Sequence, residues 1–412
     1  MYAFNMCKRI QWIGLIFIFT LTLTGCASEG SPLNHAKSSA QKNGQKSITE
    51  NNARSSNHSK VQKQNHIDDD SRPVTLMQPT KPVRAIYVTS HVANNSKRMN
   101  QLIGLVNQTE LNAMVLDVNS GVTLSNPVRS GKSNLQVRPV LSNKKSALRF
   151  REVIKQLKQN NIYLIARIVT FKNPTVANAV PEWTIKRKNG RVWTDRNGTP
   201  WIDPFRQEAW EYPLALAELA SQLGFDEIQY DYVRFPENAS KVDREVSYAN
   251  AQGWTKSEAI GKFLHRANLR SHKYGTKVSA DVFGMVGSSE DDMGIGQKWD
   301  SVAREVDVIS PMIYPSHYSN GMWGIDHPDL SPGAIVTRAL KDTLKHNRKL
   351  NEKGISTAKV RPWLQGFTAG WVHPHQKYGE AQIREQILAA RKVGIHSYMI
   401  WNSANRYPIF NA

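Results

Sequence analysis

The sequence predicts an α/β fold, a closed (β/α)8 barrel preceded by a disordered tether, from three observations. From Lys81 onward, short apolar segments alternate with longer helical ones, which is typical of repeated βα units. Eight of the short segments have strand composition, the number in a closed barrel of this type. No G-x-G-x-x-G or P-loop pattern follows any of them, and this disfavours an open doubly wound sheet.

The eight expected strands are residues 85–89, 113–118, 163–169, 227–233, 277–283, 308–314, 361–366 and 396–401. Helical segments between them include residues 96–109, 148–160, 207–223, 256–273 and 380–392. Gly224, Gly275 and Gly394 each stand just before a strand, where a glycine ends the preceding helix.

The expected strand 227–233 shows which residues face the barrel interior. Alternation places Glu227, Gln229 and Asp231 on one face and the apolar Ile228 and Tyr230 on the other. The apolar face is the one that helices cover. The polar face therefore points inward and ends in a carboxylate at the carboxyl end of the strand, where barrel enzymes carry their active sites.

Other strands end in the same way. In 277–283, Ser279 and Asp281 share the polar face, and the run again ends near an acidic residue. The strand ends therefore predict one ring of side chains around the barrel mouth, made of Asp117, Asp231, Asp281, Tyr314, Gln365, Trp401 and Asn402.

Two long loops, 171–206 and 315–331, follow the third and sixth strands and are rich in aromatic residues. They contain Trp183, Trp193 and Trp201 in the first, and His317, Tyr318, Trp323 and His327 in the second. Such rings either stack on sugars or form the packing core of the loop, and both interpretations stay open.

Paired carboxylates beside aromatic rings are what glycoside hydrolysis requires, since one protonates the leaving oxygen and the other attacks or activates water. There is no G-x-S-x-G elbow and no H-E-x-x-H motif. His373 and His375 flank a proline, and residues 290–292 lack the spacing of a calcium loop. No metal or cofactor is expected.

The stretch from Lys81 to about Phe410 resembles a family of bacterial glycoside hydrolase-like (β/α)8 barrels, distantly similar to α-amylase and chitinase-type barrels. The most specific motif is DYVRFP at 231–236. Supporting motifs are RAIYVT at 84–89, AMVLDV at 113–118, SADVFG at 279–284 and ISPMIYP at 309–315.

The resemblance implies a carbohydrate-directed enzyme in which Asp231 is the nucleophile or base. Asp281 is then the leading candidate for the acid, with Glu237 as an alternative. Substrate binding is assigned to Asp117, Tyr232, Arg234, Tyr314, Gln365, Trp401 and Asn402. The expected substrate is an extracellular or cell-wall polysaccharide. The alternative is a barrel that binds carbohydrate without cleaving it and serves wall binding or assembly.

The first 80 residues predict export and anchoring. Lys8 and Arg9 precede an apolar run, 12–23, that ends at Cys26 after small residues, as in a bacterial lipoprotein signal. We interpret residues 1–25 as the signal peptide, Cys26 as the lipidated residue and 26–80 as a disordered tether, because that segment has almost no aromatic residues. Residues 81–412 form the barrel domain, exported and lipid-anchored to the outer face of the cell membrane.

The chain is strongly basic, with a formal net charge of +20. From Lys81 onward it holds 45 basic and 29 acidic residues. Export argues against nucleic acid as a partner. An anionic wall polymer fits the expected compartment, and lysines spread over the surface are the alternative explanation.

Anchoring through Cys26 makes a direct prediction. Cys26→Ala is expected to abolish lipid labelling and to move the protein from the membrane fraction to the soluble or secreted one. Labelled lipid incorporation and fractionation measure this. A variant that stays with the membrane after a salt wash would show that the apolar run 12–23 is the anchor instead.

Overall fold

The computed structural model describes residues 76, 79–119, 126–130, 136–140 and 144–410. The expected signal segment, Cys26 and most of the expected tether lie outside the described residues. In the part of the chain that is described, no helix is both long enough and apolar enough to cross a membrane.

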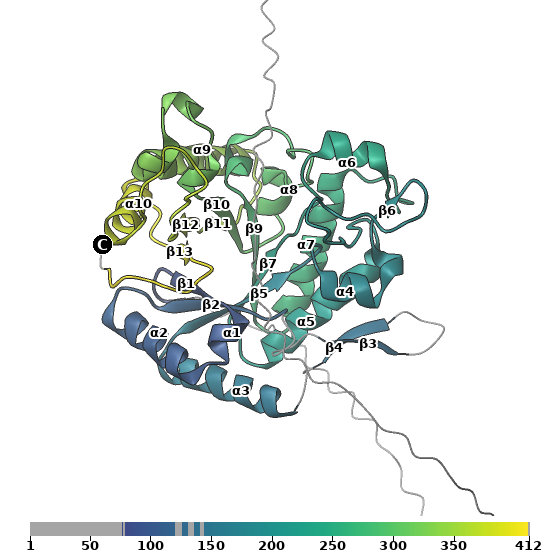
Figure 1. Ribbon diagram of the computed structural model, residues 1–412, viewed down its shortest axis with the longest axis horizontal. Helices are drawn as coiled ribbons and strands as arrows, with labels where there is room; N and C mark the ends of the chain where they lie inside the picture. Colours follow the sequence, from purple (N-terminus) through teal and green to yellow (C-terminus); the bar gives the residue numbers. More distant parts are fainter. Residues whose placement is uncertain (1–75, 77–78, 120–125, 131–135, 141–143, 411–412) are drawn as a thin grey trace, which may run out of the picture. The chain divides into compact units, whose positions relative to one another are not determined.

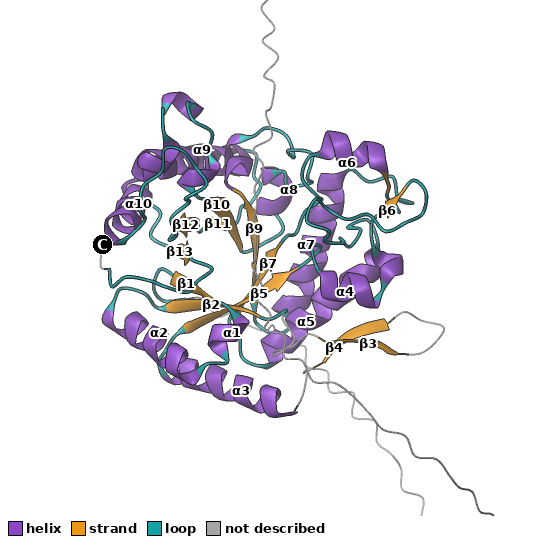
Figure 2. Ribbon diagram, viewed as in Figure 1, coloured by secondary structure: helices purple, strands orange, loops and turns teal. Residues whose placement is uncertain are grey.

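Eight parallel strands form a closed barrel, as the sequence predicts (Figure 2). In order around the barrel they are β1 (Arg84–Val88), β2 (Ala113–Asp117), β5 (Tyr163–Val169), β7 (Glu227–Asp231), β9 (Lys277–Phe283), β10 (Val308–Ile313), β12 (Trp363–Gln365) and β13 (Tyr398–Trp401). β13 pairs with β1 and closes the ring. Each strand lies within one of the expected segments or begins one residue before it.

Helices surround the ring of strands (Figure 1). The longer ones are α2 (Ser96–Gln108), α3 (Lys144–Gln159), α5 (Glu211–Gln222), α7 (Lys256–His272), α9 (Pro332–Glu352) and α10 (Glu380–Lys392). The shorter ones are α1 (Ser90–Ala93), α4 (Pro174–Ala179), α6 (Ala239–Glu245) and α8 (Trp299–Ala303). All five helical segments named from the sequence are present, with the one at 207–223 starting as a 3-10 turn, Gln207–Trp210.

Local signals set the ends of these helices. Thr255 and Glu258 form a capping box at the start of α7, in which each side chain accepts a hydrogen bond from the backbone of the other residue. Gly224, Gly275 and Gly394 all have positive φ, between 70° and 98°, and so end helices as predicted.

Short elements lie in the connections and are not predicted by the sequence patterns. They are the antiparallel pair β3 (Asn126–Ser130) and β4 (Gln136–Val140), the pair β6 (Lys186–Arg187) and β8 (Val246–Ser247), and β11 (Lys359–Val360), which pairs with β10 just before β12 begins. Further 3-10 turns are Pro181–Trp183, Gly284–Ser288, Pro315–His317, Met322–Gly324 and Pro328–Leu330.

The alternation predicted for β7 is confirmed. Ile228 and Tyr230 are fully buried in the apolar layer between the strands and the helices. Glu227 and Gln229 are equally buried, but they face the barrel interior, where Gln229 donates to Ser310 on β10 (3.4 Å). A smaller apolar cluster includes Tyr87, Tyr314 and Trp363.

A buried ion pair occupies the amino-terminal end of the barrel. Arg361 donates to both carboxylate oxygens of Glu227, and neither side chain is more than 3% exposed. The Tyr163 hydroxyl also donates to Glu227 (3.1 Å). Because it lies at the start of β7, opposite the mouth, this pair belongs to the architecture rather than to the site.

Breaking this pair is expected to destabilise the fold. Glu227→Ala leaves the Arg361 guanidinium buried without its partner, which should cost about 3–5 kcal/mol of unfolding free energy. Urea unfolding measures it. The control is Asp342→Ala, which removes the exposed Arg338–Asp342 pair on α9 and should cost about 1 kcal/mol or less. Equal losses in the two variants would contradict the prediction.

Candidate active site

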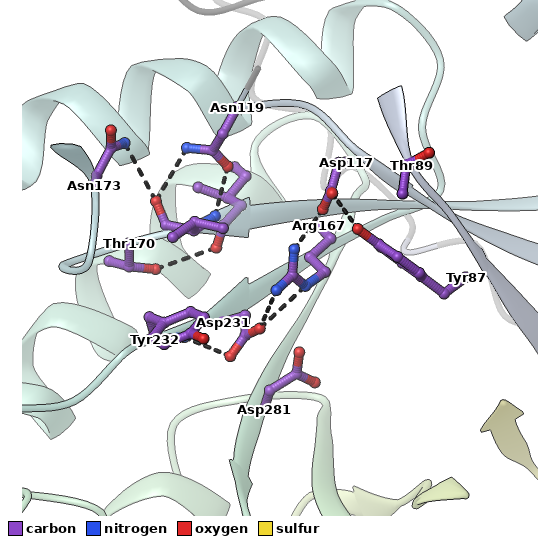
Figure 3. A network of polar contacts seen from close by, with 12 residues as sticks. Tyr87, Thr89, Asp117, Asn119, Arg167, Thr170, Asn173, Asp231, Tyr232 and Asp281 are labelled. Carbon is purple, nitrogen blue, oxygen red and sulfur yellow. Dashed lines mark hydrogen bonds and ion pairs between the residues drawn. The ribbon is translucent and has the colours of Figure 1, made fainter. Parts of the chain in front are cut away.

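The site is organised around Arg167, a buried arginine on β5 that points into the mouth of the barrel (Figure 3). Its guanidinium forms ion pairs with Asp117 at the end of β2 and with Asp231 at the end of β7. Burial alone would lower the pKa of Arg167, but the two carboxylates outweigh it and raise that pKa well above the usual value.

Arg167 is absent from the site residues that the sequence predicts, although a signal for it exists. It stands inside the otherwise apolar strand YLIARIV and shares the inward face with Ile165. A charged residue in a buried strand requires a partner, and inward-facing acids on the neighbouring strands supply two.

Asp231 is held at both of its oxygens. Oδ2 accepts from Nε of Arg167 (3.0 Å) and from Nη2, and Oδ1 accepts from the backbone N–H of Tyr232 (2.6 Å). Tyr232 has a φ of 50°, a conformation that is uncommon for a non-glycine residue and a form of strain found at functional sites. The turn after β7 is therefore shaped to fix this carboxylate.

Asp117 is tied to an aromatic pair on the next strands. The Tyr87 hydroxyl donates to Asp117 Oδ2, and the Tyr87 ring stacks on Trp401 with centroids 4.0 Å apart. The Arg167 guanidinium lies 5.1 Å from the Trp401 ring centre, within cation–π range. Burial raises the pKa of Tyr87, which keeps its hydroxyl a hydrogen-bond donor.

Asp281 has a different environment from Asp231, although the two lie side by side. Tyr230 pairs with Ala280, so the next residues, Asp231 and Asp281, stand at one level on adjacent strands. Neighbouring strands of a sheet are about 4.8 Å apart. Burial, and then the charge of Asp231, raise the pKa of Asp281 well above its usual value. The Trp363 indole donates to Asp281 (2.7 Å), and in Figure 3 Asp281 is drawn below the Arg167–Asp231 pair, with no polar contact to either residue.

Tyr314, at the end of β10, lies next to these acids. Its pKa is raised well above the usual value by burial and by the charges of Asp281 and Asp231. The mouth thus holds two carboxylates paired with one arginine, Asp117 and Asp231, and a third carboxyl group, Asp281, whose pKa is raised. This asymmetry is the arrangement that acid-assisted displacement at a sugar carbon requires.

Glu237 lies apart from this centre. It forms an ion pair with Arg234 (2.8 Å), and its side chain is 55% exposed. Among the described residues, no hydrogen bond or ion pair joins Glu237 to Asp231. Arg234 itself is buried against the rings of Trp201, Tyr232 and Phe283, with centroids 4.5–5.2 Å away.

Gln365 and Asn402 are bound to the protein itself. The Gln365 amide accepts from Ser316 (2.9 and 3.0 Å) and donates to Asp329 (3.2 Å) and the Phe367 carbonyl (3.0 Å). Asn402 donates to the carbonyls of Gly366 (2.6 Å) and Arg406 (2.8 Å). Both lie at the mouth, where they hold loops in place.

The tryptophans of the first long loop pack inside it. Trp183, Trp193 and Trp201 are each at most 4% exposed, and the latter two donate to Glu245 (3.1 Å) and Asp195 (3.2 Å). For these three rings the packing interpretation is correct. A cavity of about 270 Å3 adjoins Asp117 between the ends of β2 and β5, and Asn119, Lys172 and Thr175 also line it.

Comparison with known proteins identifies the family. A family model described as "Putative glycosyl hydrolase domain" matches residues 85–407. The chain belongs to this family. Among curated proteins, none matches it.

Two solved structures share the fold, and a third is similar in sequence over part of the chain. The glycoside hydrolase domain of PgaB (BpsB) from Bordetella bronchiseptica is 15% identical, with a TM-score of 0.53 over 78% of this chain and 94% of that one. A β-galactosidase from Marinomonas ef1 is 11% identical, with a TM-score of 0.51 over 80% of this chain and 56% of that one. A hypothetical protein from Ruminiclostridium thermocellum is 28% identical over 51% of this chain and 98% of that one, with a TM-score of 0.39.

The raised pKa of Asp281 predicts a pH-dependent stability effect. The folded protein holds this proton more tightly than the unfolded chain, so wild-type stability falls as the pH rises above about 4 and through the folded-state pKa. Asp281→Asn lacks this ionisation. The melting temperature of Asp281→Asn, relative to that of the wild type, should therefore increase as the pH rises through that range.

Thermal unfolding from pH 4 to pH 8 measures the difference. Asp342→Asn, an acid on the outer helix α9, is the matched control and should show no such trend. A melting-temperature difference for Asp281→Asn that is constant across this range would contradict the prediction.

Proposed function

We propose that the protein is a glycoside hydrolase in which Asp281 is the general acid and Asp231 the nucleophile or base. One observation carries the proposal. Two buried carboxyl groups stand on adjacent strands at the mouth, one ion-paired to Arg167 and the other with a raised pKa. Family membership supports the reaction class.

In this mechanism Asp281 gives its proton to the glycosidic oxygen as the bond to the anomeric carbon breaks. Asp231 attacks that carbon or removes a proton from the water that does. Arg167 positions Asp231 and Asp117 through its ion pairs, and Tyr87 fixes the second oxygen of Asp117. The Trp401 ring, partly exposed at the end of β13, provides a face for the sugar.

The proposed substrate is an extracellular or cell-wall polysaccharide, and the proposed location is the outer face of the cell membrane through lipid-modified Cys26. An anionic wall polymer remains a proposed partner of the basic surface. Glu237 stays an alternative acid only if a bound substrate draws it away from Arg234, because its carboxylate is paired there.

A second function, carbohydrate binding without cleavage, is favoured by one feature of the site. Arg167 engages both Asp117 and Asp231, and these bonds occupy lone pairs that a nucleophile would use. A barrel that only binds sugar needs the same rings and hydrogen-bond donors, but it does not need Asp281 to carry a proton.

Reducing-end release from a panel of wall and extracellular polysaccharides distinguishes the two functions. Asp281→Asn and Asp231→Asn should each lower kcat about 10³-fold or more on a substrate that the wild type cleaves, since each removes a group that acts in the transition state. Asp342→Asn, on the outer helix α9, removes an acid that contacts none of these carboxyl groups and should retain wild-type activity. Wild-type turnover in Asp231→Asn would refute the assignment, and binding without release by the wild type would favour the second function.

A further inference from the structure

An exposed tryptophan stands on the loop that follows β12. Trp371 is 43% exposed, more than any other tryptophan in the part of the chain that the structure describes. Its ring stacks on Phe367, with centroids 6.1 Å apart and planes 17° apart. A large apolar ring held at this angle at the surface is suited to binding another flat apolar surface, and a pyranose ring presents one.

A row of aromatic rings connects Trp371 with Asp281 and Asp231. Phe367 meets Tyr314 edge to face, with centroids 5.6 Å apart. Tyr314 in turn lies close enough to Asp281 and Asp231 for both charges to affect its hydroxyl. Trp371 is therefore the outer end of an aromatic path that starts at the proposed point of cleavage.

The loop that carries Trp371 is fixed by hydrogen bonds on both sides of the ring. Buried Asp329 accepts from the backbone N–H of Gln376 (3.0 Å) and from the side chain of Gln365 (3.2 Å). The Tyr378 hydroxyl donates to the Asp329 carbonyl (2.9 Å), and its backbone N–H donates to Thr368 (3.0 Å). A platform held in place before binding loses less conformational entropy when a ligand arrives.

Strand order places this platform across the mouth from the cavity beside Asp117. That cavity lies at the ends of β2 and β5, whereas the Trp371 loop follows β12. β12 is four strands from β5 in a ring of eight, so the two lie on opposite sides. A ligand that reaches both must extend across the acid pair.

We propose that Trp371 is the stacking platform of a distant sugar subsite, and that the site takes the interior of a long glycan chain rather than its end. This inference rests on the proposed function for the position of cleavage. Sugar rings bound on both sides of Asp231 and Asp281 make an internal glycosidic bond the one that is broken.

Binding to a catalytically silenced chain tests the platform separately from hydrolysis. In the full-length Asp281→Asn protein, calorimetry measures the Kd of trimers and hexamers of β-1,4-linked N-acetylglucosamine, β-1,4-glucose, α-1,4-glucose and β-1,4-xylose. For the sugar that binds, the hexamer should bind more tightly than the trimer. Adding Trp371→Ala should remove that gain and weaken hexamer binding about tenfold.

Tyr274→Ala is the matched control, because Tyr274 is 42% exposed but precedes β9 at the opposite end of the barrel. It should leave both Kd values unchanged. Equal weakening of trimer and hexamer by Trp371→Ala, no weakening at all, or no binding of any hexamer would overturn the proposal. If hexamer binding depends on Trp371 while the wild type releases no reducing ends, the subsite stands and the hydrolase function fails.

For an active wild type, the products report the bond that is cleaved. Early release of mixed oligosaccharides from a long chain of the sugar that binds supports internal cleavage. Release of one short product from the start would overturn it.

Discussion

The constraint on which the mouth depends is the burial of one guanidinium. Arg167 cannot be removed from water without compensating charge, and the two carboxylates that supply it come from strands on either side of β5. The same bonds therefore hold the fold at this end and align Asp117 with Asp231. A substitution at Arg167 would leave the buried Asp231 and the half-buried Asp117 without their shared cation, so the position holds both the packing of this end and the alignment of the two acids.

A second buried ion pair lies at the opposite end of the barrel, and its charges can be compared with those at the mouth. Glu227 and Arg361 balance each other in charge, and Tyr163 also donates to Glu227, at the end where barrels carry stability rather than catalysis. At the mouth the charges do not balance in the same way. Asp117 and Asp231 share one arginine, which leaves an excess of negative charge beside Asp281, whose pKa is raised by burial and then by the charge of Asp231.

Alternation of side chains predicts much of this arrangement and explains what it misses. It places Asp231 and Asp281 inward correctly. Side chains of a strand alternate between its two faces, so once helices cover the apolar face the other residues must point inward. It does not say which partner an inward side chain finds. Gln365 is at the predicted mouth, but its amide is bound by Ser316 and Asp329, which are brought there by loop geometry. Arg167 is not among the predicted site residues because the rest of its strand is apolar. Only its pairing with acids on other strands shows its role.

For the proposed hydrolase, the excess negative charge has a consequence that family membership alone does not give. Glycoside hydrolysis develops positive charge on the sugar ring in the transition state, while the ground state is neutral. A site that carries one uncompensated carboxylate charge, fixed in place by Arg167 and Tyr87, interacts more strongly with that transition state than with the bound sugar. Arg167 prevents a larger excess of negative charge at the mouth, because its guanidinium pairs with both Asp117 and Asp231. With a single arginine between two carboxylates, the mouth keeps one negative charge for the proposed reaction. The same arginine limits the repulsion between the two acids that would destabilise the fold.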